Sequence, residues 1–167
     1  MGRKPIIRIR ETVKTDAPWI EKWLMEPGIL EGFPMIDKRE IDDAVRVWMQ
    51  YVGKGMAITA LYKKEPCGAG NLYIQPIEKL KHQCLFVVVV DPKYQGQGIG
   101  TLLIRMLERR AKERFKIELL HLEVYEGNRA IRLYERLGFV YYGEHPGFLK
   151  DSAGNYLGKV LMQKSLV

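Results

Sequence analysis

The sequence has no long hydrophobic run, and this absence excludes a first class of function. No segment reaches the roughly 18 consecutive apolar residues that a membrane-spanning helix needs, so we expect no membrane partner. The first ten residues, MGRKPIIRIR, are basic and lack the apolar stretch of a secretory signal. We therefore expect a cytoplasmic protein.

Cysteine and histidine are scarce. The chain has 2 cysteines and 3 histidines among its 167 residues, and none stands at the spacing of a metal site. Cys67 and Cys84 both lie in apolar, strand-like surroundings, which favours a packing role. The counts exclude a disulfide framework, and we expect no metal ion.

Acidic residues are outnumbered by basic ones. The chain has 27 lysines and arginines against 20 aspartates and glutamates, which gives a formal net charge of +7. This balance suits a polyanionic ligand. The basic residues form neither a stripe interleaved with aromatics nor a recognition-helix pattern, so we do not expect a nucleic acid partner.

Hydrophobic periodicity predicts one domain, residues 1–167, without internal repeats or linkers. The expected strands are Ile6–Arg10, Met56–Tyr62, Cys67–Ile74, Leu85–Val90, Leu119–Tyr125, Phe139–Glu144 and Lys159–Ser165. The expected helices lie at 19–25, from Asp37 to Val52, at 99–115 and after Asn128. Because the apolar residues of Leu85–Val90 do not alternate with polar ones, we predict a strand buried on both faces.

Two local signals mark the helix ends in the first half of the chain. Pro27-Gly28 is expected to break the first helix, and the residues after it to form a loop. Asp37 is expected to cap the second helix, with Glu40 as its capping-box partner.

The most informative segment joins the strand Leu85–Val90 to the helix that starts at Ile99. The turn between them, Gln95-Gly96-Gln97-Gly98-Ile99-Gly100, is rich in glycine. Glycine lets the backbone approach a ligand closely. The first turn of a helix presents free N–H groups, and the helix dipole favours anions there. The junction is therefore a candidate phosphate cradle.

Two common phosphate-binding motifs do not fit this turn. A nucleoside-triphosphate P-loop needs Lys-Ser or Lys-Thr after its last glycine, but Gly100 is followed by Thr101 and Leu102. A dinucleotide-binding turn has the spacing G-x-G-x-x-G, whereas Gly96, Gly98 and Gly100 give G-x-G-x-G. On the turn alone, a plain connection with glycines for tight packing stays open.

Two segments resemble one known family. The turn has the form Q/R-x-x-G-x-G/A and follows Val90-Asp91-Pro92, which resembles the acetyl-CoA-binding motif of the GNAT superfamily of N-acetyltransferases. The segment from Asn128 to Phe139, NRAIRLYERLGF, resembles that superfamily's motif N-x-x-A-x-x-L-Y-x-[KR]-x-G-F at every fixed position. Asn128 also suits a helix N-cap, and Gly138 suits the end of that helix. The resemblance covers about residues 84 to 143.

The resemblance implies an α/β (α+β) fold, with a mixed, mostly antiparallel sheet of about seven strands flanked by about four helices. The strands would splay where acetyl-CoA, the implied co-substrate, enters. Main-chain groups of the motif strand would contact the pantetheine arm, the turn would hold the pyrophosphate, and the start of the last helix would contact the arm. The implied cofactor-binding residues are Val88, Val89, Val90, Gln95, Gly96, Gln97, Gly98, Ile99, Gly100, Thr101 and Asn128.

The implied reaction is direct acetyl transfer to a primary amine of a small molecule or of a peptide or protein N-terminus. It needs a proton donor for the CoA thiolate and a base for the amine. Tyr134 stands where superfamily members place the donor, and a phenol can protonate a sulfur of similar basicity. Glu123 matches the glutamate of the ribosomal-protein N-terminal acetyltransferase branch and is the expected base, although a solvent-facing strand glutamate stays open. Glu31, Asp37 and Tyr125 are rivals.

The acceptor is expected to meet the segments Trp23–Asp37 and His145–Tyr156, which form the substrate wall in the resembled fold. Acidic residues in the first segment suit a cationic amine, and ordinary surface charge explains them equally well. A second class of function stays open, because some members of the fold bind acyl-CoA without turnover. The sequence is also compatible with a homodimer.

Overall fold

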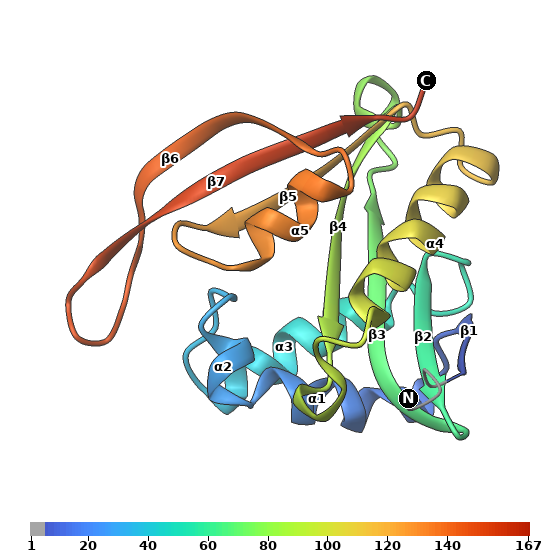
Figure 1. The fold of residues 1–167 in the computed structure, drawn as a ribbon, viewed down its shortest axis with the longest axis horizontal. Helices are drawn as coiled ribbons and strands as arrows, with labels where there is room; N and C mark the ends of the chain where they lie inside the picture. The colour runs from blue at the N-terminus through green and yellow to red at the C-terminus, as the bar shows by residue number, and fades with distance from the viewer. Residues whose placement is uncertain (1–5) are drawn as a thin grey trace.

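One seven-stranded sheet organises the chain in the computed structural model, which describes residues 6–167 (Figure 1). The strand order is β1-β2-β3-β4-β5-β7-β6, and every neighbouring pair is antiparallel except β4 and β5. The strands are β1 (Ile7–Glu11), β2 (Ala57–Tyr62), β3 (Glu65–Ile74), β4 (Gln83–Val90), β5 (Leu119–Tyr125), β6 (Val140–Lys150) and β7 (Tyr156–Ser165). This architecture confirms the predicted fold class. The prediction about a secretory signal falls partly on residues 1–5, which lie outside the described part.

Helices cover both faces of the sheet. They are α1 (Ala17–Leu24), α2 (Pro27–Leu30), α3 (Lys38–Met49), α4 (Ile99–Glu113) and α5 (Ala130–Arg136). On one face, α4 and α5 pack on a hydrophobic cluster that includes side chains of β3, β4 and β5. On the other face, α1 and α3 pack on a second cluster over β2, β3 and β4. The β6–β7 hairpin extends away from α1 and α3 (Figure 1). No helix in residues 6–167 has the length and apolarity to cross a membrane.

Two details at helix starts differ from the predictions. Pro27 is expected only to break the first helix, but it is also the first residue of a further short helix, α2. Proline suits that position, since the N–H that it lacks has no partner in a helix anyway. Asp37 caps α3 as predicted, and its side chain accepts the Glu40 N–H at 2.9 Å. The Glu40 carboxylate accepts from the Ile36 N–H at 2.7 Å instead of completing the predicted capping box.

The prediction that the apolar strand, now β4, is buried on both faces is wrong. Only Cys84, Phe86 and Val89 are buried, and the other apolar side chains of the strand are half-buried. The reason is that β4 pairs with β5 over residues 83–85 only. Beyond this point, β4 has a described neighbour strand on one side alone, so its apolar residues are only partly covered.

A buried carboxylate joins the start of α1 to the sheet. Asp16 is 2% exposed and accepts from both guanidinium nitrogens of Arg10, at 2.6 and 2.9 Å. It also accepts from the Thr59 hydroxyl at 2.9 Å and from the Val13 N–H at 3.0 Å. Burial opposes the charged form, but the Arg10 guanidinium and the other donors outweigh it and lower the pKa of Asp16. The folded protein is therefore stabilised by the ionised carboxylate.

We expect the pH dependence of stability to show this carboxylate. Because the folded-state pKa of Asp16 is depressed, its contribution is present above the unfolded pKa of about 4 and is lost as pH falls through the folded pKa. Asp16→Asn should lower the free energy of unfolding at pH 7 by about 1–3 kcal/mol and flatten its decline in acid. Urea unfolding between pH 3 and pH 7 measures both effects.

Asp42→Asn is the matched control, because Asp42 forms an exposed ion pair with Lys38 at 2.9 Å. It should change the free energy of unfolding by less than about 1 kcal/mol. Equal losses in the two variants would contradict the role given to Asp16.

Candidate active site

An opening between β4 and β5 is the central feature of the site. The two strands pair at only three positions, and the ladder ends with Leu85 opposite His121. Both strands continue beyond this pair, β4 to Val90 and β5 to Tyr125, without pairing to each other. The predicted splay of the sheet is therefore present, and we call it the β4–β5 gap.

Main-chain groups of β4 face the gap at alternate residues. The Asp91 N–H donates to the Cys67 carbonyl of β3 at 2.9 Å, which sets the direction for the odd-numbered residues. Because backbone directions alternate along a strand, the N–H and C=O groups of Val88 and Val90 point away from β3 and into the gap. Val89, which the sequence analysis included in the cofactor-binding set, instead directs its backbone to β3 and its side chain into the core beneath α1 and α3.

The glycine-rich turn leaves a series of unused N–H donors. Within residues 6–167, none of the N–H groups of residues 96–101 has a protein acceptor. The first bond of α4 runs from the Leu102 N–H to the Gly98 carbonyl at 3.1 Å. Gly96 and Gly98 have φ angles of +76° and +86°, a left-handed conformation that favours glycine. Consecutive donors at a helix N-terminus form an anion-binding surface.

The backbone of this turn is open on the side of Gly96 and Gly98. A Cβ added at Gly96 or Gly98 would meet no atom within 4 Å, so the backbone there borders open space. Gln95 turns back toward the strand, and its Nε2 donates to the Val90 carbonyl at 3.2 Å. The turn therefore has free N–H donors and glycine-dependent backbone angles, and its role as a phosphate cradle stays a prediction.

A buried hydrogen bond anchors the strand that leads into the cradle. Asp91 is 6% exposed, and its Oδ2 accepts from the indole N–H of Trp23 in α1 at 3.0 Å. Its Oδ1 accepts from the Lys93 N–H at 2.9 Å. Sequence reasoning noticed Asp91 only as part of a motif and missed Trp23, because 68 positions separate the partners. The bond connects α1, on one face of the sheet, to the end of β4 that leads into the glycine-rich turn.

Asn128 lies just before α5 and supplies a side-chain acceptor to its first turn, although Arg129 and not the predicted Asn128 occupies the N-cap position. The Asn128 Oδ1 accepts from the Ala130 N–H at 2.9 Å. Its Nδ2 has no acceptor among residues 6–167, and it lies 3.5 Å from the position a Cβ would take at Gly32. The segment after α2 therefore lies beside the start of α5. One donor of Asn128 stays available for a ligand.

Tyr134 lies on the α4–α5 side of the sheet. Its ring makes edge contacts with Phe86 of β4 and Phe139, at centroid distances of 6.3 and 6.1 Å. Burial raises the pKa of Tyr134 to about 12, so the phenol keeps its proton at neutral pH. Its hydroxyl has no hydrogen-bond partner within residues 6–167, which leaves the proton free for a ligand.

Glu123 lies on the opposite side of the sheet. Leu120, Leu122 and Val124 of β5 point into the core beneath α4, so alternation directs Glu123 to the other face. Its side chain is 44% exposed and pairs with the Lys159 ammonium of β7 at 3.1 Å. Sequence reasoning missed Lys159, because no local pattern reveals which β7 residue meets Glu123.

The three rival bases, Glu31, Asp37 and Tyr125, differ in exposure and in the contacts that they make. The Asp37 carboxylate is occupied by the cap of α3. Tyr125 is buried, and burial together with the nearby Glu123 carboxylate raises its pKa. Glu31 is exposed at the end of α2. Among the predicted bases, Glu123 is the carboxylate on β5 itself, and its side chain reaches toward β7.

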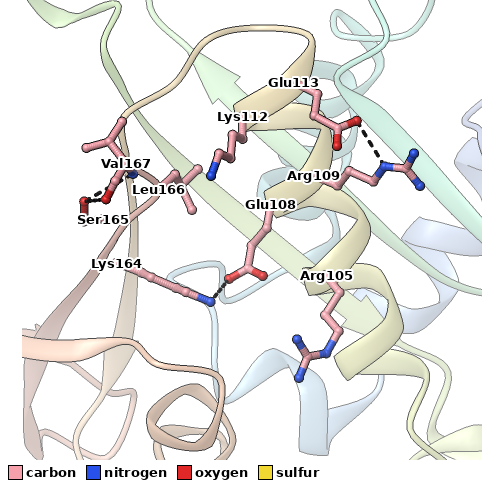
Figure 2. A pocket seen from close by; sticks show the side chains of 9 residues that line it. All are labelled: Arg105, Glu108, Arg109, Lys112, Glu113, Lys164, Ser165, Leu166 and Val167. Atoms are coloured by element: carbon pink, nitrogen blue, oxygen red, sulfur yellow. Dashed lines mark hydrogen bonds and ion pairs between the residues drawn. The ribbon is translucent and has the colours of Figure 1, made fainter.

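A separate hollow of about 470 Å³ lies away from this site, between the C-terminal half of α4 and the end of β7. Figure 2 shows the side chains that line it. Its charges are partly paired, with Lys164 at 2.5 Å from Glu108 and Arg109 at 3.1 Å from Glu113. Arg109 is ten residues beyond the start of α4, roughly 15 Å along the helix from the cradle. Within residues 6–167, no group of three or more His, Cys, Asp or Glu side chains could hold a metal ion.

Comparison with known proteins identifies the family. Residues 19–139 match the acetyltransferase (GNAT) family. The chain belongs to this family. Membership confirms the family that the two motifs predicted.

Individual relatives match over shorter segments or share the fold alone. A spermine/spermidine N(1)-acetyltransferase of Bacillus subtilis is 39% identical over 56 residues, which cover 33% of this chain and 37% of that protein. A [ribosomal protein bS18]-alanine N-acetyltransferase of Haemophilus influenzae is 43% identical over 60 residues, 36% of this chain and 40% of that protein. The matches therefore span about two-fifths or less of these curated relatives.

Solved structures share the fold over nearly the whole chain. A phosphinothricin acetyltransferase from Sinorhizobium meliloti, solved in complex with acetyl-CoA, has a TM-score of 0.79 at 20% identity. The similarity covers 95% of this chain and 88% of that one.

Gly98→Ala should destabilise the protein because Gly98 adopts a left-handed conformation at the N-terminus of α4. We expect a loss of about 1–2 kcal/mol in the free energy of unfolding, measured by urea denaturation. Gly28→Ala is the control, since Gly28 lies in α2 without a positive φ and its Cβ would meet nothing within 4 Å. It should be neutral or slightly stabilising. A loss in both variants would contradict the conformational explanation.

Proposed function

We propose that this protein transfers the acetyl group of acetyl-CoA directly to a primary amine of a small molecule or a peptide N-terminus. The observation that carries the proposal is the β4–β5 gap with Tyr134 on one side of the sheet and Glu123 on the other. This arrangement lets a thioester and an amine meet from opposite faces, each beside a group that can move a proton.

On the thioester side, the chain supplies donors and shape. The free N–H groups of residues 96–101 would hold the pyrophosphate, beginning beside Gln95. Main-chain groups of Val88 and Val90 and the Nδ2 of Asn128 would bind the pantetheine arm. The Val90 carbonyl already accepts from Gln95, so this contact requires that side chain to move or to share the carbonyl.

The chemistry requires two proton transfers. The amine nitrogen attacks the acetyl carbonyl carbon, the carbon–sulfur bond breaks, and the thiolate takes the phenolic proton of Tyr134. Glu123 accepts the proton that the amine loses. The raised pKa of Tyr134, about 12, keeps this donor protonated until the thiolate forms.

The relatives support amine acceptors without agreeing on one. One curated relative is named for spermine and spermidine and another for the alanine of a ribosomal protein. Both names describe transfer to an amino group. Local residues on the acceptor side must therefore decide the substrate of this chain.

Acetyl-CoA should raise the melting temperature of the protein selectively. A ligand present at 100 times its Kd adds about 2.7 kcal/mol of stability, which thermal unfolding detects readily. We expect a rise with acetyl-CoA and with CoA, and a smaller one or none with ATP. An equal rise with ATP, or none with acetyl-CoA, would contradict the cradle assignment.

Tyr134→Phe should lower kcat at least tenfold and leave acetyl-CoA binding unchanged, because only the proton donor is removed. Thiol release measures kcat, and thermal shift measures binding. Tyr141→Phe is the control, since Tyr141 is 58% exposed on β6. Turnover near the wild-type rate in Tyr134→Phe would refute its role. Acetyl-CoA binding by the wild type without release from any amine would instead support a non-catalytic acyl-CoA-binding module.

A further inference from the structure

A lysine ammonium lies beside Glu123, on the side of β5 away from the β4–β5 gap. Lys159 lies on β7 opposite Tyr125 of β5 and opposite His145 of β6, so three strands place these residues in one row. Its Nζ is 3.1 Å from the Glu123 carboxylate, and its side chain is only 13% exposed. A largely buried cation at this place is a fixed part of the site and not a mobile surface charge.

An aromatic ring fixes the position of the ammonium. Phe148 lies in the irregular part of β6, and its ring centroid is 3.8 Å from the Lys159 Nζ. That ring is in turn stacked on Tyr125 at 6.4 Å and contacts His145 edge-on at 5.2 Å. Cation–π contact and the ion pair act on the same nitrogen, so its location is strongly defined.

The ammonium keeps hydrogen-bonding capacity for a ligand. A lysine has three N–H donors. Glu123 is the only anionic or hydrogen-bonding partner of the Lys159 Nζ among residues 6–167, and the ring of Phe148 accepts no conventional hydrogen bond. A poorly hydrated ammonium with unused donors favours an anionic partner.

We infer that Lys159 determines acceptor specificity by binding a carboxylate that the acceptor carries next to its amine. This inference rests on the proposed function, because it places the amine beside Glu123. An amine within hydrogen-bond reach of Glu123 lies close to Lys159, since both contact the same carboxylate. An α-amino acid holds its amine and carboxylate two bonds apart, so it satisfies both groups at once.

The same geometry disfavours a polycationic acceptor. The Lys159 charge compensates Glu123 and repels a second ammonium at short range. Glu126, the other carboxylate next to this row, is occupied, since its Oε1 accepts the Gly158 N–H at 2.8 Å. A polyamine would therefore find the carboxylates of β5 and its following turn already used.

Matched ligand pairs test the inference. L-Leucine and L-phenylalanine are each compared with their amides, which keep the amine and side chain but lack the carboxylate, and spermidine serves as the cationic probe. Thiol release from acetyl-CoA gives kcat/KM, and thermal shift of the CoA-saturated protein gives binding without turnover. The wild type is compared with Lys159→Met, Lys159→Arg and Lys79→Met. Lys79 is the control because it is an exposed lysine of the helical turn Glu78–Leu80, outside both segments expected to meet the acceptor.

We expect the wild type to prefer each acid over its amide by about tenfold or more, as removal of a charge-assisted hydrogen bond predicts. Lys159→Met should bring the ratio to within about threefold, while Lys159→Arg and Lys79→Met keep it. The ratio within one variant cancels any general effect on Glu123, and comparison of the ratios between variants cancels the intrinsic difference between the two amines.

An unchanged ratio in Lys159→Met would overturn the inference, and so would a wild-type preference for spermidine over both acids. Absence of both binding and turnover with the acids would overturn it too. Lys159-dependent binding of the acids without thiol release from any amine would support a carboxylate site at Lys159 but refute the proposed transferase activity, and with it the acceptor role of that site. Turnover of amines without a preference for the acids would support the proposed transferase activity and refute the inference.

Discussion

The end of hydrogen bonding between β4 and β5 is the constraint on which the rest of the structure depends. A strand pair that stops at Leu85 and His121 leaves the main-chain groups of Val88 and Val90 without a strand partner. Unpaired backbone groups inside a protein are costly, so the gap is stable only with water or a ligand in it. The glycine-rich turn follows from the same strand, which places the unused N–H donors of α4 at the carboxyl end of β4. The unpaired main-chain groups of β4 and the free N–H donors of the turn therefore follow one another along the chain at the interruption in the sheet.

Two buried carboxylates keep the walls of this gap in place. Asp91 connects the cradle strand to α1 through the indole of Trp23, and Asp16 connects the start of α1 to β1 and β2. Each carboxylate accepts more than one hydrogen bond, which offsets the cost of burying its charge. Hydrogen bonds therefore hold the beginning of α1 to one edge of the sheet and its last turn to the strand that leads into the cradle.

Local pairing of charges says more about ligands than the overall balance does. The net charge of +7 suggests a polyanionic partner, yet several of its basic groups are already paired with carboxylates. The arginines and lysines of the pocket in Figure 2 belong to this group and lie far along α4 from the cradle. Lys159 differs, because it is largely buried and has a single carboxylate partner in the described chain. The burial of Lys159 and the free N–H donors of its ammonium are the reasons for proposing it as a binding group, and the net charge of the chain is not.

The sequence by itself determined the features that depend on neighbouring residues. The glycine-rich turn, the side-chain acceptor of Asn128 before α5 and the helix end at Gly138, whose φ is +92°, follow from local hydrogen bonds and backbone angles that a short motif encodes. Only the tertiary structure decided the features that depend on pairing across the sheet. The backbone direction of Val89, the half-buried face of β4 and the contact of Glu123 with Lys159 all follow from strand register. Register joins residues far apart in the chain, and no local periodicity specifies which of them meet.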